Sequence, residues 1–102
     1  MTVILQQTMP EGTTLDFLDE VTREMGVETD PPAGLIVHTH FEQDGRVRVV
    51  DVWNSQDEYE SFRDSTLMPA MQKAAAGHGM DMSQAPQPEQ SILEVHGVVT
   101  HR

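Results

Sequence analysis

The sequence predicts an α+β domain of the ferredoxin-like type, with the element order β-α-β-β-α-β. The dipeptide Asp44-Gly45 joins two runs of alternating apolar residues, which is typical of a tight β-hairpin. A capping box from Ser55 to Glu58 follows at once and indicates the start of a helix. A strand and a helix precede the hairpin, and one more strand follows the second helix. We therefore expect a four-stranded antiparallel sheet with two helices on one face.

The first strand is predicted at Val3 to Met9. Either Thr13 or Thr14 caps the first helix, because a threonine hydroxyl can bond the free N–H groups of the first turn. Apolar residues then recur at helical spacing from Leu15 to Met25. Gly26 can adopt the left-handed conformation that ends a helix.

The hairpin strands are predicted at Gly34 to Gln43 and Arg46 to Trp53. Asp44-Gly45 suits a type I′ turn, since both central residues of that turn need positive φ. Counting outward from the turn gives the pairs His40–Val49, His38–Asp51 and Ile36–Trp53.

Side chains alternate along these strands, so the register sorts them onto two faces. We expect the aliphatic face to pack under the helices; it holds Leu35, Val37, Thr39, Phe41, Val50 and Val52. We expect the mixed face to be free of helices; it holds Ile36, His38, His40, Glu42, Val47, Val49, Asp51 and Trp53.

The second helix is predicted to begin after Ser55 and to kink or restart at Pro69, which has no N–H to donate. A loop rich in Gly, Pro, Gln and Met follows at residues 77–90. The final strand is predicted at Ser91 to Thr100, with Glu94 and His96 on its mixed face.

Composition excludes several classes of function. The 17 acidic residues outnumber the 6 Lys and Arg residues, and the formal net charge is −11. This field repels phosphate backbones and anionic lipid, so we expect no nucleic-acid partner and no membrane partner. The chain has no cysteine, which excludes disulfides and thiolate sites. The first residues lack the basic and apolar regions of a signal peptide, so a cytoplasmic location is expected.

The second half of the chain resembles a known superfamily. The resemblance rests on the Asp44-Gly45 hairpin, on Val50 to Ser55 running into Tyr59 and Phe62, and on Leu67 to Ala70. These features are similar to those of the dimeric α/β-barrel superfamily, in particular its antibiotic-biosynthesis-monooxygenase type. The resemblance implies a homodimer with a pocket on the helix-free face of each sheet. It also implies cofactor-free oxygenase or polyketide-cyclase chemistry on a small apolar or aromatic molecule.

The superfamily also includes haem-degrading enzymes. Their catalytic Trp and His align with Phe62 and Gln72 of this chain. Because this chain has neither a Trp nor a His at these two positions, haem degradation is disfavoured.

The candidate catalytic residues are His38, Asp51, His40 and His96. A carboxylate opposite an imidazole fixes its tautomer and raises its basicity, so His38 and Asp51 are predicted to act as base and orienting group. His40 and His96 are candidates to polarise a carbonyl group. Candidate substrate-binding residues are Trp53, Val49, Glu94 and Ile36.

Three alternatives remain open from the sequence. The histidines can be polar lining groups in a non-catalytic ligand-binding or structural homodimer, with Trp53 as a structural aromatic residue at the dimer contact. The His38-x-His40 pair, with Glu94 or His96, can form a metal site. The segment from His78 to Met82 can offer soft ligands to copper or form a lid of adaptable Met side chains.

Overall fold

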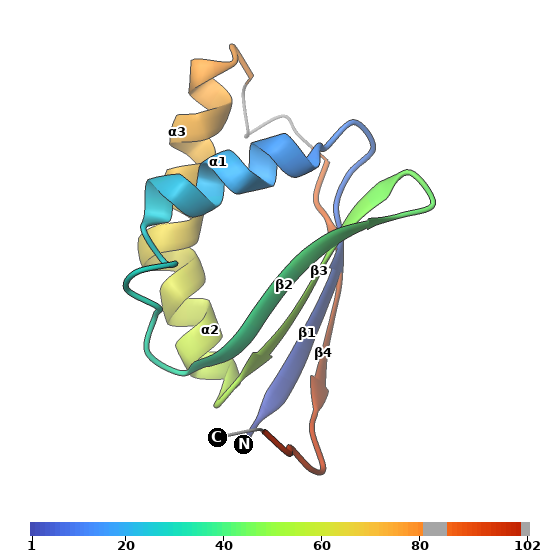
Figure 1. Ribbon diagram of the computed structural model, residues 1–102, viewed down its shortest axis with the longest axis vertical. Coiled ribbons are helices and arrows are strands. Elements are labelled where there is room, and N and C mark those ends of the chain that lie inside the picture. Colours follow the sequence, from blue (N-terminus) through green and yellow to red (C-terminus); the bar gives the residue numbers. More distant parts are fainter. Residues whose placement is uncertain (81–85, 101–102) are drawn as a thin grey trace.

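The computed structural model describes residues 1–80 and 86–100 of the 102-residue chain, and it confirms the predicted fold class (Figure 1). Four antiparallel strands form one sheet in the order β2-β3-β1-β4. The strands are β1 (Val3–Thr8), β2 (Leu35–Gln43), β3 (Arg46–Trp53) and β4 (Glu89–Glu94).

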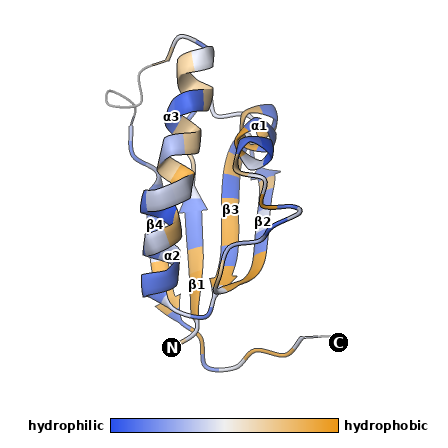
Figure 2. Ribbon diagram, turned by 90° about the vertical axis from the view of Figure 1, so that its left-hand side faces the viewer, coloured by the Kyte–Doolittle hydropathy of each residue, from blue (hydrophilic) through white to orange (hydrophobic). Residues whose placement is uncertain are grey.

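All the described helices cover the same face of this sheet (Figures 1 and 2). Helix α1 spans Leu15–Met25, and a second rod runs without a break through α2 (Gln56–Phe62), the π-helical turn η1 (Arg63–Leu67) and α3 (Met68–Gly77). No helix in the described part of the chain is long and apolar enough to cross a membrane.

The helix ends confirm most of the local signals. The Thr14 hydroxyl accepts from the backbone N–H of Phe17, and Gly26 ends α1 in the left-handed region. Ser55 caps α2 by accepting from the backbone N–H of Glu58. Pro69 lies in the first turn of α3, directly after η1. Because proline has no N–H for the carbonyl four residues back, the regular α-helical ladder is interrupted at this point.

The hairpin forms with the predicted turn. Asp44 has φ 53° and Gly45 has φ 79°, as a type I′ turn requires. The pairs His40–Val49 and His38–Asp51 are confirmed. A β-bulge between Leu35 and Val37 shifts the far end, however, so Leu35 and not Ile36 lies opposite Trp53. A bulge adds one unpaired residue and so reverses the face of everything beyond it.

The predicted assignment of the two sheet faces was wrong. Val47, Val49, Asp51 and Trp53 are buried, and the mixed face packs under the helices while the aliphatic face is free of them. The hairpin residues alone cannot show which face the helices cover, because both faces of the hairpin carry apolar residues. The same-side residues Val3 and Leu5 of β1, together with Trp53, make the mixed face the larger apolar surface, and it forms a core with Tyr59 of α2.

The last strand is shorter than predicted. It ends at Glu94, which pairs with Val3, the first residue of β1. One further hydrogen bond joins the Val95 N–H to the Thr2 carbonyl at 2.9 Å, just beyond the last pair of the strand. His96 therefore lies in an exposed bend outside the sheet.

Gly34 fixes the entry to the hairpin. It has φ 88°, and a Cβ atom at this position would overlap the side chain of Glu58 in the α2 capping box. Its carbonyl accepts from the Asn54 N–H at 2.7 Å, which ties the start of β2 to the end of β3. A glycine is therefore needed here on both conformational and steric grounds.

Candidate functional site

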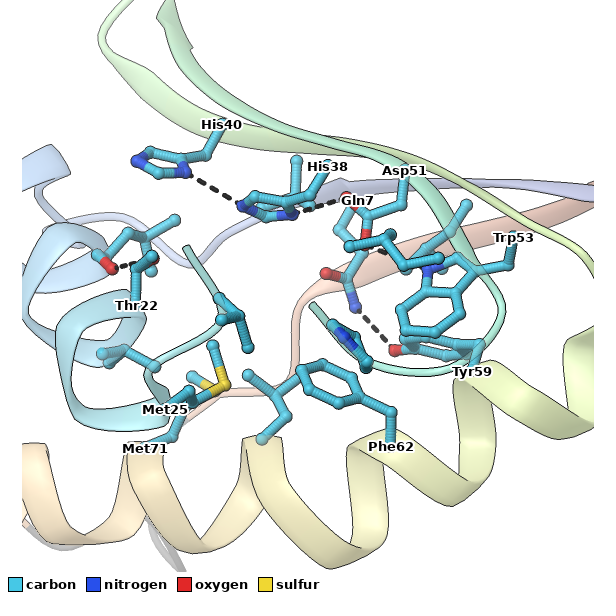
Figure 3. A pocket seen from close by; sticks show the side chains of 18 of the residues that line it. Gln7, Thr22, Met25, His38, His40, Asp51, Trp53, Tyr59, Phe62 and Met71 are labelled. Atoms are coloured by element: carbon cyan, nitrogen blue, oxygen red, sulfur yellow. Dashed lines mark hydrogen bonds and ion pairs between the residues drawn. The ribbon is translucent and has the colours of Figure 1, made fainter. Parts of the chain in front are cut away.

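A cavity lies between the sheet and the helices, and its lining is almost wholly apolar (Figure 3). About 80 Å³ of it can be occupied by the centres of water-sized molecules, which is roughly half the volume of a cavity that binds one benzene molecule. Its polar lining groups are few and come from three strands and two helices: Gln7, Thr22, His38, His40, Asp51, Trp53 and Tyr59. An apolar cavity with a few convergent polar groups is the usual form of a small-molecule site.

His38 and Asp51 meet at the wall of this cavity. His38 Nδ1 lies 2.6 Å from Asp51 Oδ1, and the Asp51 side chain is only 8% exposed. Trp53 Nε1 donates to the second carboxylate oxygen at 3.2 Å. Both oxygens of this buried carboxylate therefore have a donor, which a buried charge requires. Since an ionised carboxylate only accepts, Asp51 holds His38 in the tautomer with the proton on Nδ1.

His40 continues the hydrogen bonding from the cavity wall to the surface. Its Nδ1 lies 3.0 Å from His38 Nε2, and its Nε2 lies 2.9 Å from Oδ1 of Asp19 on α1. The His40 side chain is 19% exposed, and that of Asp19 is 49% exposed. Both nitrogens of each imidazole are thus engaged by protein groups. His40 has no free N–H to polarise a ligand carbonyl in this arrangement.

Tyr59 supplies a second polar group at the opposite side of the cavity (Figure 3). Its ring packs edge-to-face on Trp53, with centroids 5.7 Å apart, and its hydroxyl accepts from Gln7 Nε2 at 3.4 Å. Burial raises the pKa of the Tyr59 hydroxyl, and the nearby Asp51 charge acts in the same direction, against Arg63. Tyr59 therefore stays protonated and can donate its O–H to a ligand.

A second hollow adjoins the cavity along the α2–η1–α3 rod. It is wider, with about 510 Å³ open to water-sized molecules. The two spaces share five lining residues, which therefore form the wall between them: Gln7, Met9, Tyr59, Leu67 and Met71. The Gln7–Tyr59 hydrogen bond lies in this shared wall.

The predicted site residues divide into two groups. His38, His40, Val49, Asp51 and Trp53 line the cavity together. Three others do not line it: Ile36, Glu94 and His96. Leu35 replaces Ile36 because of the bulge. Glu94 is exposed on the edge strand β4, and the expectation that His96 lies on that strand was wrong.

Two expectations about the site's surroundings also change. The site is on the helix-covered face of the sheet, not on the helix-free face. Trp53 is buried under α2 beside Tyr59 and Phe62, so it is not a residue of the helix-free face.

The metal alternatives gain no support. Within residues 1–80 and 86–100, no group of three His, Asp or Glu side chains has the arrangement to hold a metal ion. His78 Nε2 lies 2.7 Å from Glu20 Oε2. Of the two methionines in that loop, Met80 is exposed, and Met82 lies outside the described residues.

Sequence reasoning missed Gln7, Asp19 and Tyr59 as site residues. Gln7 could have been found, since it is a polar residue at an inward position between Leu5 and Met9. Tyr59 belongs to the motif on which the superfamily resemblance rests, but the sequence assigns it no role in the site. Nothing in the sequence connects Asp19 with His40, because 21 positions separate them.

The sequence matches no family model and no curated protein. Solved structures do match. One is SnoaB, a cofactor-independent oxygenase from Streptomyces nogalater, with a TM-score of 0.59, 12% identity and coverage of 98% of this chain and 97% of that one. The chain has the fold of the antibiotic-biosynthesis-monooxygenase proteins.

Two further structures support the same fold. A candidate antibiotic biosynthesis monooxygenase from Nitrosomonas europaea matches with a TM-score of 0.63 and 11% identity, over 95% of this chain and 100% of that one. Rv0793 from Mycobacterium tuberculosis matches with a TM-score of 0.61 and 14% identity, over 97% and 98% of the two chains. The predicted resemblance is confirmed at the level of structural neighbours.

Proposed function

We propose that the protein is a small-molecule enzyme of the cofactor-independent monooxygenase or polyketide-tailoring type. Its ligand is a small, largely apolar, aromatic molecule bound in the cavity between sheet and helices. His38 is the base, and Asp51 orients it. The observation that carries this proposal is the 2.6 Å His38–Asp51 contact at the wall of an otherwise apolar cavity.

The chemistry that this site supports begins with removal of a proton. His38 Nε2 takes a proton from an acidic C–H or O–H group, and the electron pair stays on the ligand as a carbanion or phenolate. In a monooxygenase, the CH₂ group of such an anion reacts with O₂ to give a carbonyl group and water, so the ligand supplies all the electrons. In a cyclase, the anion attacks a carbonyl of the same molecule. Tyr59 can donate to the oxyanion that develops in either case.

Oxygen uptake tests the proposal directly. Anthrone is a suitable probe, since it is an aromatic ketone with an acidic CH₂ group. We expect the wild-type protein to consume O₂ in its presence, and His38→Ala to lower the rate by at least about 100-fold. His78→Ala is the matched control, because His78 pairs with Glu20 away from the cavity. A rate unchanged by His38→Ala would remove His38 from the mechanism.

A binding function without turnover is the second candidate. It is favoured by one observation, that both nitrogens of His38 are hydrogen-bonded to Asp51 and His40. A base needs a free lone pair, and this arrangement offers none. Saturable binding of 1-naphthol, followed by its fluorescence, without oxygen uptake from any probe would support this candidate.

We also propose that a second copy of the chain covers the helix-free face. Three large apolar side chains on that face are exposed, namely Val37 by 45%, Phe41 by 37% and Leu93 by 51%. An exposed apolar surface of this kind on a monomer is typical of an interaction site. We expect a dimer by sedimentation velocity at micromolar concentration, and we expect Phe41→Asp to convert it to a monomer with unchanged helix content. A monomeric wild-type protein would contradict this.

A further inference from the structure

A continuous chain of hydrogen bonds runs from the core to the surface through the two imidazoles (Figure 3). Trp53 and His38 both contact the Asp51 carboxylate, at 3.2 and 2.6 Å. His38 Nε2 lies 3.0 Å from His40 Nδ1, and His40 Nε2 lies 2.9 Å from Asp19 Oδ1. The two imidazoles therefore lie between a buried carboxylate on β3 and a half-exposed carboxylate on α1.

The acceptors at the two ends fix the number of protons on the rings. A carboxylate accepts hydrogen bonds and has no proton to donate. His38 Nδ1 therefore carries a proton toward Asp51, and His40 Nε2 carries one toward Asp19. The contact between the two remaining nitrogens is a hydrogen bond only if one of them is also protonated. With that proton in place, the pair would hold three protons on four nitrogens and would be a single cation between two carboxylates.

We infer that His38 and His40 take up a ligand's proton as one unit, and that Asp19 is the positioning residue that holds the resulting cation. This inference rests on the proposed role of His38 as the base. When the third proton is absent, the facing lone pairs of the two rings repel each other, and His38 Nε2 is available to the cavity. A C–H or O–H bond of the ligand then breaks, its proton bonds to His38 Nε2, and its electron pair stays on the ligand. The hydrogen bond to His40 forms around that proton.

The charges around the pair support this role. The titratable groups facing the two imidazoles are Asp51 on β3, Asp19 on α1, Tyr59 on α2 and Glu42, two residues beyond His40 on β2. No Lys or Arg is among the cavity-lining residues in the described parts of the chain. The surroundings therefore favour one added positive charge on the pair and provide no other cation for a ligand anion. A ligand that fills the cavity also covers His38 from water, while His40 keeps its link to the surface through Asp19.

Counting ring protons tests the inference without a substrate. In the full chain with ¹⁵N-labelled histidine, nitrogen chemical shifts report which ring nitrogens carry a proton as pH is raised. We expect a plateau with three protonated nitrogens on His38 and His40 together, since one shared proton disfavours binding of another. We expect Asp19→Asn to lower the pH at which this plateau ends, because an opposite charge beside His40 is lost. His40→Gln should remove the plateau, because no second ring is left to share the proton.

Asp16→Asn is the matched control, because it removes the same charge from the exposed side of the same helix. The inference is wrong if the two rings pass from four protons to two without a plateau, or if Asp19→Asn and Asp16→Asn have equal effects. If the plateau is absent while His38→Ala abolishes oxygen uptake, the shared proton is wrong and the base role stands. A plateau in a protein that neither consumes O₂ nor cyclises any probe overturns the catalytic role and with it the uptake of a ligand's proton.

Discussion

The two faces of the sheet both carry apolar residues along β3 but have different roles. On the helix-covered face, Trp53 and Val47 are each only 1% exposed, and Asp51 is buried with a partner for each oxygen. On the helix-free face, Val50 and Val52 are half-buried and pack under no helix. Burial of a side chain in a strand therefore depends on what covers it, and the strand's own alternation cannot show which face is covered.

Removing the largest side chain of the covered face should have the largest effect. Trp53 packs against Tyr59 and Phe62, with ring centroids 5.7 and 5.4 Å away. We expect Trp53→Ala to lower the free energy of unfolding by about 3–5 kcal/mol, because it leaves a cavity and removes the donor to Asp51. Urea denaturation followed by circular dichroism measures this. A loss below about 1 kcal/mol would mean that α2 does not depend on this face.

Two neighbouring valines compare the faces with matched chemistry. Val49 is 7% exposed on the covered face, while Val50 is half-buried on the other. We expect Val49→Ala to destabilise the protein by about 2 kcal/mol, and Val50→Ala by about half as much or less. The measurement is urea denaturation at low and high protein concentration. A Val50→Ala effect that grows with protein concentration would show that a second chain covers the helix-free face. If Val49→Ala and Val50→Ala destabilise the protein equally at every concentration, the proposed difference between the two faces is wrong.

Tyr59 gives the smallest effect, and it depends on pH. Burial raises the pKa of its hydroxyl in the folded state. Above the unfolded-state pKa of about 10, the unfolded chain releases this proton more readily than the folded chain, so stability falls as pH rises. We expect Tyr59→Phe to change stability little at pH 7 and to reduce the loss between pH 9 and 11. Denaturation curves at those pH values check this; an identical alkaline loss in both proteins would show that Tyr59 is not shielded from water.

Local chemistry made much of the fold predictable. Asp44-Gly45 determines its turn because both central positions of a type I′ turn have positive φ, which these two residues tolerate. Ser55 determines the start of a helix because its side chain accepts a hydrogen bond from the N–H three positions later. From the turn, the register of His38 against Asp51 follows by counting. These signals act over a few residues, and each was confirmed.

The errors came from information that lies elsewhere in the chain. The bulge at Ile36 has no local marker, since it follows from fitting Leu35 beside Trp53 against the core. The choice of covered face depends on β1, whose inward residues Val3 and Leu5 add to the apolar area of one side. The end of β4 depends on where β1 begins. The contact of His40 with Asp19 depends on the crossing of α1 over the sheet edge, which no spacing in the sequence encodes.

The π-helical turn η1 has a consequence for how the chain tolerates insertions and deletions. Phe62, Leu67 and Met71 all line the cavity, although five residues separate the first two and four separate the last two. A regular α-helix turns by about 100° per residue, so a spacing of five keeps both side chains in phase only where the helix is locally widened. Deleting one residue from Arg63–Leu67 would leave a spacing of four between Phe62 and Leu67, which a regular α-helix keeps in phase, whereas one further inserted residue would rotate Met71 and all of α3 out of phase with α2. This rod should therefore accept the loss of one residue at η1 far more readily than the gain of one.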